Sequence, residues 1–235
     1  MSAYNPWPLG SLPESWQRKE PFLLKDKGYK WDDPREIIDI FEKKLADYSG
    51  SNYAVLTDCC SNAIFLCLKY LDHKGKVEVP THTYVSVPMQ VIHAGAKLEF
   101  IEMPWQGIYR LAGTNIIDGA GRFRPGMYED KLALHTLSFQ IKKRVPIGKG
   151  GAILTNSKAA YEWLKLASYD GRDLTTPYDS VGHVKNLGWH FYMTPEDAAR
   201  GILIMDELGS DLDDVMSSNN YPDLTKMEVF KNLVI

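Results

Sequence analysis

The sequence predicts an α/β domain with a central, mostly parallel sheet flanked by helices. Short apolar runs such as YAVLTD (53–58), KVEVP (76–80) and KLEFIE (97–102) are typical of buried strands. Helical patterns such as SNAIFLCLKYL (61–71) lie between them, and this alternation is typical of parallel sheets. The composition agrees, because the 235 residues are 44% hydrophobic and 24% charged, as in globular proteins.

The elements divide the chain into three parts. Residues 1–32 are rich in Pro, Trp and charge, and we expect an extended N-terminal arm. The main domain, residues 33–208, opens with a helix that Asp33 can cap and whose first turn suits Pro34. Beyond the runs above, we expect helices at 85–95, 158–170 and 194–208 and strands at 114–118, 132–139 and 150–156. Residues 209–235 form a C-terminal tail that is too short for a second domain.

The bulk properties exclude several classes of protein. A net charge of −3 argues against a general nucleic-acid or membrane-surface binder. No apolar run approaches the roughly 18 residues of a membrane helix, and the N-terminus lacks a signal-peptide core. Neither CxxC nor HExxH spacing is present, so no metal site is predicted. Cys59, Cys60 and Cys67 are clustered and odd in number, which indicates reduced thiols in a cytoplasmic protein.

Ligands of open α/β sheets bind at the carboxyl ends of the strands, so the residues that follow each strand are site candidates. The stretch DCCSN (58–62) ends a strand and begins a helix. Unpaired N–H groups at a helix N-terminus favour an anionic phosphate, and Ser61 adds a hydroxyl group. Taken alone, these residues are more simply explained as an ordinary helix cap.

Two further strand ends carry an aromatic ring and a carboxylate. Tyr84 follows the strand 76–80 and could stack on a flat ring, although most aromatic residues serve only the core. Asp118 closes the strand NIID and could keep a pyridine nitrogen protonated through a charge-assisted hydrogen bond. A loop cap to Gly119 is the alternative role for this carboxylate.

The stretch LSFQIKKRVPIGKGGAIL (137–154) offers a nucleophile. Ser138 ends a strand, and Lys142 and Lys143 follow closely. A partly desolvated lysine can form a Schiff base with an aldehyde, although most lysines are solvated charges. The GKGG sequence (148–151) lacks the G-x-x-x-x-G-K-[ST] pattern of a phosphate loop, and we expect it to allow either a close approach of two backbones or a sharp turn.

Taken in order, these stretches resemble the sugar aminotransferases of the DegT/DnrJ/EryC1/StrS family, which use pyridoxal phosphate (PLP) and have fold type I. The resemblance runs from about residue 34 to about residue 208. It rests on YAVLTDCCSNAIFLCL, VPTHTYVSVPMQVIHAGAKLEFIE, IIDGAG, SFQIKKRVPIGKGGAILTN and GWHFYMTPEDAARGILIMDEL. The family lysine lies five residues after the serine, and this spacing selects Lys143 over Lys142.

The resemblance implies a PLP site with two catalytic residues. Lys143 would form the Schiff base and move the proton, while Asp118 would pair with the pyridine nitrogen. The other implied cofactor-binding residues are Cys60, Ser61, Asn62, Tyr84, Ser138 and His190. His190 stands where the family has an asparagine that reaches the phosphate of the neighbouring subunit, which implies a homodimer with shared active sites.

The family's usual amino donor is glutamate, and its usual acceptor is a keto-sugar attached to a nucleotide. One branch of the family has histidine in place of the lysine and acts as a dehydratase, and Lys143 argues against that branch.

Some positions depart from the family pattern. Cys60 stands for a glycine, and Gly121 stands for a glutamine or histidine that contacts the cofactor ring. Most of the small C-terminal domain of the family is also expected to be lacking. Two alternatives to an active aminotransferase therefore stay open, namely a catalytically impaired PLP-binding relative and a non-enzymatic interaction module.

Overall fold

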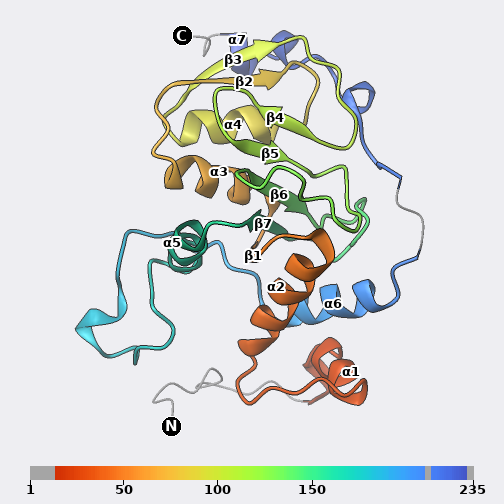
Figure 1. The fold of residues 1–235 in the computed structure, drawn as a ribbon, viewed down its shortest axis with the longest axis vertical. Helices are drawn as coiled ribbons and strands as arrows, with labels where there is room; N and C mark the ends of the chain where they lie inside the picture. The colour runs from red at the N-terminus through yellow and green to blue at the C-terminus, as the bar shows by residue number, and fades with distance from the viewer. Residues whose placement is uncertain (1–13, 210–212, 232–235) are drawn as a thin grey trace.

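The computed structural model describes residues 14–209 and 213–231, and it has the predicted α/β architecture, with helices packed on a mixed sheet (Figure 1). The larger sheet has the strand order β1-β7-β6-β5-β4, and a second sheet pairs β2 with β3. The strands are β1 (Tyr53–Thr57), β2 (Lys76–Pro80), β3 (Lys97–Ile101), β4 (Tyr109–Leu111), β5 (Ile116–Asp118), β6 (Leu134–Ser138) and β7 (Gly151–Thr155). A 3.0 Å backbone bond from Glu78 N to Ala112 O connects the two sheets.

The strand directions differ from the expected, mostly parallel arrangement. β5 pairs with β6 and β2 with β3 in parallel, whereas the β1–β7, β6–β7 and β4–β5 pairs are antiparallel. The connections explain the difference, because residues 112–115 and 139–150 join neighbouring strands without a crossover helix. The α/β class is thus confirmed, and the strand–helix alternation that predicts parallel pairing ends after β3.

Both faces of the sheet are buried, as alternate residues of β1 illustrate. Val55 packs into one core cluster, and its neighbours Ala54 and Leu56 pack into the other. The first cluster is covered by α3 (Cys60–Tyr70), α4 (Ser86–His93) and α5 (Lys158–Ser168), and the second by α2 (Glu36–Ser49) and α6 (Pro195–Asp206). This two-sided packing fixes the strand ends, and with them the residues that follow each strand.

The N-terminal region is not wholly extended. Residues 1–13 of the expected arm lie outside the described residues, but α1 (Glu20–Asp26) is a helix. Its Leu24 is fully buried in the core cluster that α2 and α6 share. The helix α2 is present, but the predicted cap at Asp33 is wrong, because α2 begins at Glu36 and its N-cap residue Arg35 makes no side-chain capping bond. Asp33 instead accepts a 2.9 Å hydrogen bond from the backbone N–H of Arg35 in the turn before the helix.

The last part of the chain folds back onto the main domain. Residues 213–231, hereafter the C-terminal segment, contain two short 3₁₀ turns and α7 (Glu228–Lys231). Leu224 and Phe230 are buried in the same core cluster as Val77 of β2. Figure 1 shows this segment, in blue, beside β2 and β3. It is therefore an integral part of the packing around the sheet.

Candidate active site

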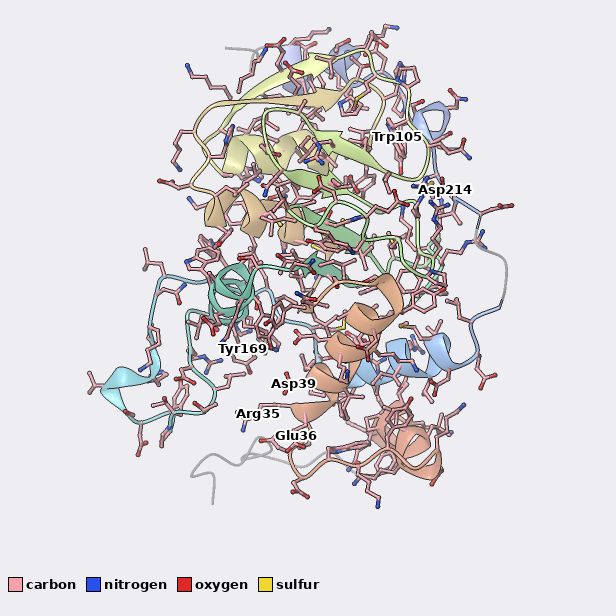
Figure 2. The ribbon with its side chains drawn as sticks, viewed as in Figure 1. Arg35, Glu36, Asp39, Trp105, Tyr169 and Asp214 are labelled. Carbon is pink, nitrogen blue, oxygen red and sulfur yellow. The ribbon has the colours of Figure 1, made fainter. Side chains whose placement is uncertain are left out.

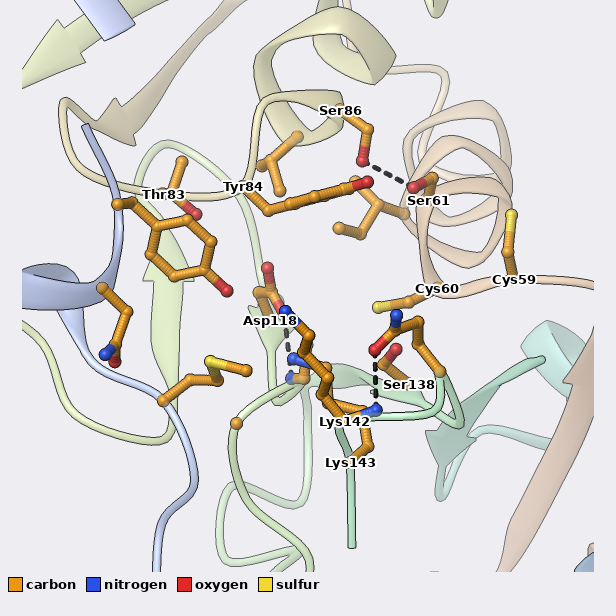
Figure 3. Close-up of a pocket in the computed structure, with 18 of the residues that line it drawn as sticks. Cys59, Cys60, Ser61, Thr83, Tyr84, Ser86, Asp118, Ser138, Lys142 and Lys143 are labelled. Atoms are coloured by element: carbon orange, nitrogen blue, oxygen red, sulfur yellow. Dashed lines mark hydrogen bonds between the residues drawn. The ribbon is translucent and has the colours of Figure 1, made fainter. Parts of the chain in front are cut away.

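A cavity of about 500 Å³ lies at the carboxyl ends of β5 and β6, beside the start of α3. Most of the predicted site residues line it, namely Cys60, Ser61, Tyr84, Asp118, Ser138 and Lys143. These residues lie far apart in the sequence, and the sheet brings them together as the strand-end rule predicts. Figure 3 shows how their side chains surround the cavity.

Asp118 is the buried carboxyl group of this cavity, with 4% of its surface exposed. Its Oδ2 accepts a 2.7 Å hydrogen bond from the hydroxyl of Tyr109, and its Oδ1 accepts a 2.9 Å bond from the backbone N–H of Ala120. Burial raises the pKa of Asp118, and the two hydrogen bonds and the charge of Lys143 oppose this shift. A cation placed against Asp118 would therefore stabilise its ionised form.

Lys143 is half-buried on the same cavity, whereas the side chain of Lys142 is exposed. Burial lowers the pKa of Lys143, and the negative charge of Asp118 opposes the shift. A lowered pKa increases the fraction of free amine near neutral pH, which is the form that attacks a carbonyl carbon. Lys142 and Lys149 also line the cavity, so the lining alone contains three amines.

The start of α3 forms another wall of the cavity. Cys59 is the N-cap residue, and its Sγ accepts a 3.5 Å hydrogen bond from the backbone N–H of Asn62. The hydroxyl groups of Ser61 and Ser86 lie 2.6 Å apart, so α4 contributes a second hydroxyl at this point. Backbone N–H groups and hydroxyls at a helix N-terminus provide donors for an anion.

Gly151 allows the start of α3 to approach β7. A Cβ atom at Gly151 would lie 2.5 Å from the carbonyl carbon of Cys59 and from the nitrogen of Cys60. Only a residue without a side chain fits there, so the close backbone approach that we expected of the GKGG sequence is confirmed.

Tyr84 provides an accessible aromatic ring, with 58% of its surface exposed. In Figure 3 the ring is seen edge-on, across the cavity from Lys142, Lys143 and Ser138. The preceding Thr83 is buried, and its hydroxyl lies 2.6 Å from that of Tyr109. The polar network of the cavity floor therefore runs from Thr83 through Tyr109 to Asp118.

Two predicted residues lie outside the cavity lining. The Asn62 side chain donates a 2.7 Å hydrogen bond to Asp58 Oδ1, at the rim. His190 lies with Nδ1 2.8 Å from Asp170 Oδ2, and 67% of its side chain is exposed. Within one chain His190 therefore does not join the other site residues, and its expected role toward a neighbouring subunit stays a prediction.

Several residues of the candidate site are not predicted from the sequence, among them Tyr109, which is outside the cavity lining but donates a hydrogen bond to Asp118. Tyr109 belongs to β4, a three-residue strand too short to give a periodic signal, and it pairs in register with Asp118. Ser86, Gln140 and Lys149 line the cavity, together with three residues of the C-terminal segment, Met216, Asn220 and Tyr221. Serines at helix starts are a usable signal, but nothing local to the C-terminal segment indicates that it returns to this site.

Residues 27–108 match the DegT/DnrJ/EryC1/StrS aminotransferase family. Over these residues, which include α2 and extend to the loop before β4, the match agrees with the family resemblance that the motifs predict. No curated protein matches the sequence.

Solved aminotransferase structures share the fold at low sequence identity. DesV from S. venezuelae has 19% identity and a TM-score of 0.62, over 80% of this chain and 61% of DesV. DesI, solved in the presence of its TDP-sugar product, has 16% identity and a TM-score of 0.58, over 81% of this chain and 57% of DesI. Helicobacter pylori PseC, an aminotransferase involved in the biosynthesis of pseudoaminic acid, has 14% identity and a TM-score of 0.59, over 82% of this chain and 63% of PseC. The chain thus has their fold and spans less than two thirds of each.

The groups in the cavity fit the chemistry of PLP. The half-buried amine suits the aldehyde of PLP, and the buried carboxyl group suits its pyridine nitrogen. The helix N-terminus with hydroxyls suits the phosphate, and the open aromatic face suits the ring. In residues 14–209 and 213–231, no cluster of three or more His, Cys, Asp or Glu side chains could hold a metal ion. In the same ranges, no helix is long and apolar enough to cross a membrane.

Proposed function

We propose that this chain forms the cofactor-binding part of a PLP-dependent aminotransferase that acts on a keto-sugar. The observation that carries the proposal is the presence of both Lys143 and Asp118 in the lining of one cavity. Burial lowers the pKa of the amine and raises that of the carboxyl group. The family match over residues 27–108 supports the same reading.

The proposed roles follow from the chemistry of each group. When bound, PLP supplies an aldehyde that condenses with amines and a protonated ring that accepts an electron pair. Lys143 would hold the aldehyde carbon and, once released, would move a proton at Nζ. Asp118 would keep the pyridine nitrogen protonated, since a buried carboxylate is stabilised by an adjacent cation.

The remaining residues would bind and orient the cofactor. Ser61, Ser138 and the backbone around Cys60 and Asn62 would hold the phosphate at the start of α3. Tyr84 would cover one face of the ring and exclude water from it.

The substrates and the assembly are also part of the proposal. Glutamate is the proposed amino donor, and the acceptor is a keto-sugar linked to a nucleotide, as the TDP-sugar product of DesI supports. We further propose a homodimer in which the exposed His190 approaches the phosphate of the neighbouring subunit. The three free thiols support a reducing compartment such as the cytoplasm.

Lys143→Ala tests the proposal, with the adjacent Lys142→Ala as a matched control. The wild-type protein incubated with PLP is expected to turn yellow, and borohydride should fix the cofactor to a single peptide. Lys143→Ala should abolish both the absorbance and the adduct, whereas Lys142→Ala should retain them. A colourless wild-type protein refutes the proposal, and an adduct on Lys142 refutes the assignment of the lysine.

A catalytically impaired PLP-binding protein is the second candidate, and Gly121 favours it because the position cannot make the ring contact of the family. Rapid mixing of the PLP-loaded protein with glutamate separates the two candidates. Loss of the yellow absorbance in one turnover supports an aminotransferase, whereas an unchanged spectrum supports the impaired relative.

A further inference from the structure

The C-terminal segment lies along the edge of the cavity that is opposite α3. Successive backbone bonds tie it to three loops of the main domain. The backbone N–H of Val215 donates to Gly121 O at 2.9 Å, and the N–H of Gly107 donates to Met216 O at 2.8 Å. The N–H of Ser218 donates to Trp105 O at 3.0 Å, and the N–H of Leu224 donates to Thr81 O at 2.9 Å. Figure 2 shows Trp105 and Asp214 on the same side of the molecule. Backbone bonds therefore fix the segment to the main domain at residues 215–218 and again at Leu224.

A nearly buried ion pair fixes the beginning of the segment. Arg122 donates to both oxygens of Asp214, at 2.8 and 2.7 Å. Only 7% of the Asp214 side chain is exposed, and the hydrogen bonds from Arg122 lower its pKa. A bidentate, shielded pair of this kind gives a specific geometry, unlike an exposed ion pair.

The segment also explains why residue 121 is glycine. A Cβ atom at Gly121 would lie 2.8 Å from Gly107 O and 3.1 Å from Met216 Cβ. The space that a longer side chain would need is therefore taken by the loop at Gly107 and by the C-terminal segment. The glutamine or histidine that relatives have at this position cannot fit here.

The C-terminal segment also contributes side chains to the cavity. Asn220 and Tyr221 both line it. The Tyr221 ring lies 5.8 Å from the ring of Trp105 and 6.4 Å from that of Tyr84, and its carbonyl lies 2.9 Å from His82 Nδ1. Burial, and then the negative charge of Asp118, raise the pKa of Tyr221 to about 12. The phenol is thus neutral at physiological pH and can donate a hydrogen bond.

We propose that Tyr221 is a binding residue for the phenolic oxygen of the PLP ring, in place of the contact that Gly121 cannot make. This inference rests on the proposed function. In PLP the phosphate arm and the phenolic oxygen lie on opposite sides of the aldehyde carbon. With the phosphate at α3, the phenolic oxygen would lie toward the edge formed by the C-terminal segment. Tyr221 lines the cavity on this edge, and its hydroxyl is a neutral donor.

Tyr221→Phe removes only the hydroxyl, and Tyr70→Phe at the far end of α3 is the matched control. PLP affinity is measured by quenching of tryptophan fluorescence, and the bound chromophore is titrated with pH by absorbance. Tyr221→Phe is expected to weaken PLP binding about tenfold and to move the midpoint of the titration. Tyr70→Phe should change neither. Circular dichroism checks that both variants fold.

Gly121→Ala provides a second test, because it should displace Met216 and with it Tyr221. We expect Gly121→Ala to weaken PLP binding. The double variant with Tyr221→Phe should bind PLP no more weakly than whichever single variant has the lower affinity. Fully additive effects overturn the inference, as does Tyr221→Phe with the affinity and midpoint of the wild-type protein. Failure of the wild-type protein to bind PLP through Lys143 would instead overturn the proposed function, and with it this inference.

Discussion

Gly151→Ala is the substitution with the most direct link from backbone packing to the candidate site. The added Cβ would lie 2.5 Å from the Cys59 carbonyl carbon and the Cys60 nitrogen. Ordinary contact begins at about 3.4 Å, so the start of α3 or β7 must move by about 0.9 Å. Both partners are backbone atoms in buried elements, and no side-chain rotation relieves the overlap.

Two effects are expected from this displacement. Overpacking of a well-packed site costs about 1–3 kcal/mol of the free energy of unfolding. Movement of α3 also draws its N–H groups and Ser61 away from the proposed phosphate position. Loss of one hydrogen bond to a charged group costs about 1.5–3 kcal/mol, which corresponds to PLP affinity weaker by about 10- to 150-fold.

The assay combines urea unfolding with PLP titration by absorbance. Gly182→Ala is the matched control, since the nearest atom to its added Cβ would be Ser180 Oγ, at 3.9 Å. We expect the control to bind PLP like the wild-type protein. Wild-type stability and affinity in Gly151→Ala would refute the close approach of α3 to β7, and lost stability with unchanged affinity would refute the placement of the phosphate at α3.

Two further predictions concern the buried ionisable groups. Burial lowers the pKa of His135 from 6.5 to about 4, so the unfolded chain binds more protons than the folded protein between pH 6.5 and 4. The free energy of unfolding should therefore fall by about 3 kcal/mol as the pH drops from 7 to 4. Urea unfolding against pH measures this loss, and a His135→Gln variant with the wild-type slope would contradict it. Glu42 is 4% exposed, lies 2.8 Å from Lys165 Nζ and accepts a bond from the backbone N–H of Leu56, so Glu42→Ala should cost about 3–5 kcal/mol. Asp47→Ala, at an exposed pair with Lys43, should change stability by less than about 1 kcal/mol, and equal losses in the two variants would contradict the role of burial.

Much of the candidate site could be predicted because its residues follow strands that the sequence marks clearly. Asp118 closes β5 and Ser138 closes β6, and the ends of these two parallel strands meet at one edge of the sheet. The choice of Lys143 over Lys142 came from the family resemblance, in which the lysine lies five residues after the serine, and in the structure Lys143 is half-buried and Lys142 exposed. The close approach at Gly151 was also predictable, because a cluster of glycines indicates a backbone that needs space.

Other features could not be read locally because they depend on contacts between distant residues. Tyr109 meets Asp118 through a hairpin whose strands have three residues each, too few to show a period. The directions of β4 and β7 follow from connections without a crossover helix, which the alternation of early strands and helices did not reveal.

The sequence by itself determined the α/β class, the family resemblance and the strand-end residues of the cavity such as Asp118 and Ser138, because strand ends and motif spacing are local properties of the chain. Only the tertiary structure decided which residues lie across the cavity from α3. Gly121 looked like the loss of a contact, yet Met216 and Gly107 fill its place and the same segment carries Tyr221 to the cavity. Residue 121 and Tyr221 lie about a hundred residues apart in the sequence, and they are linked only because one backbone packs against another.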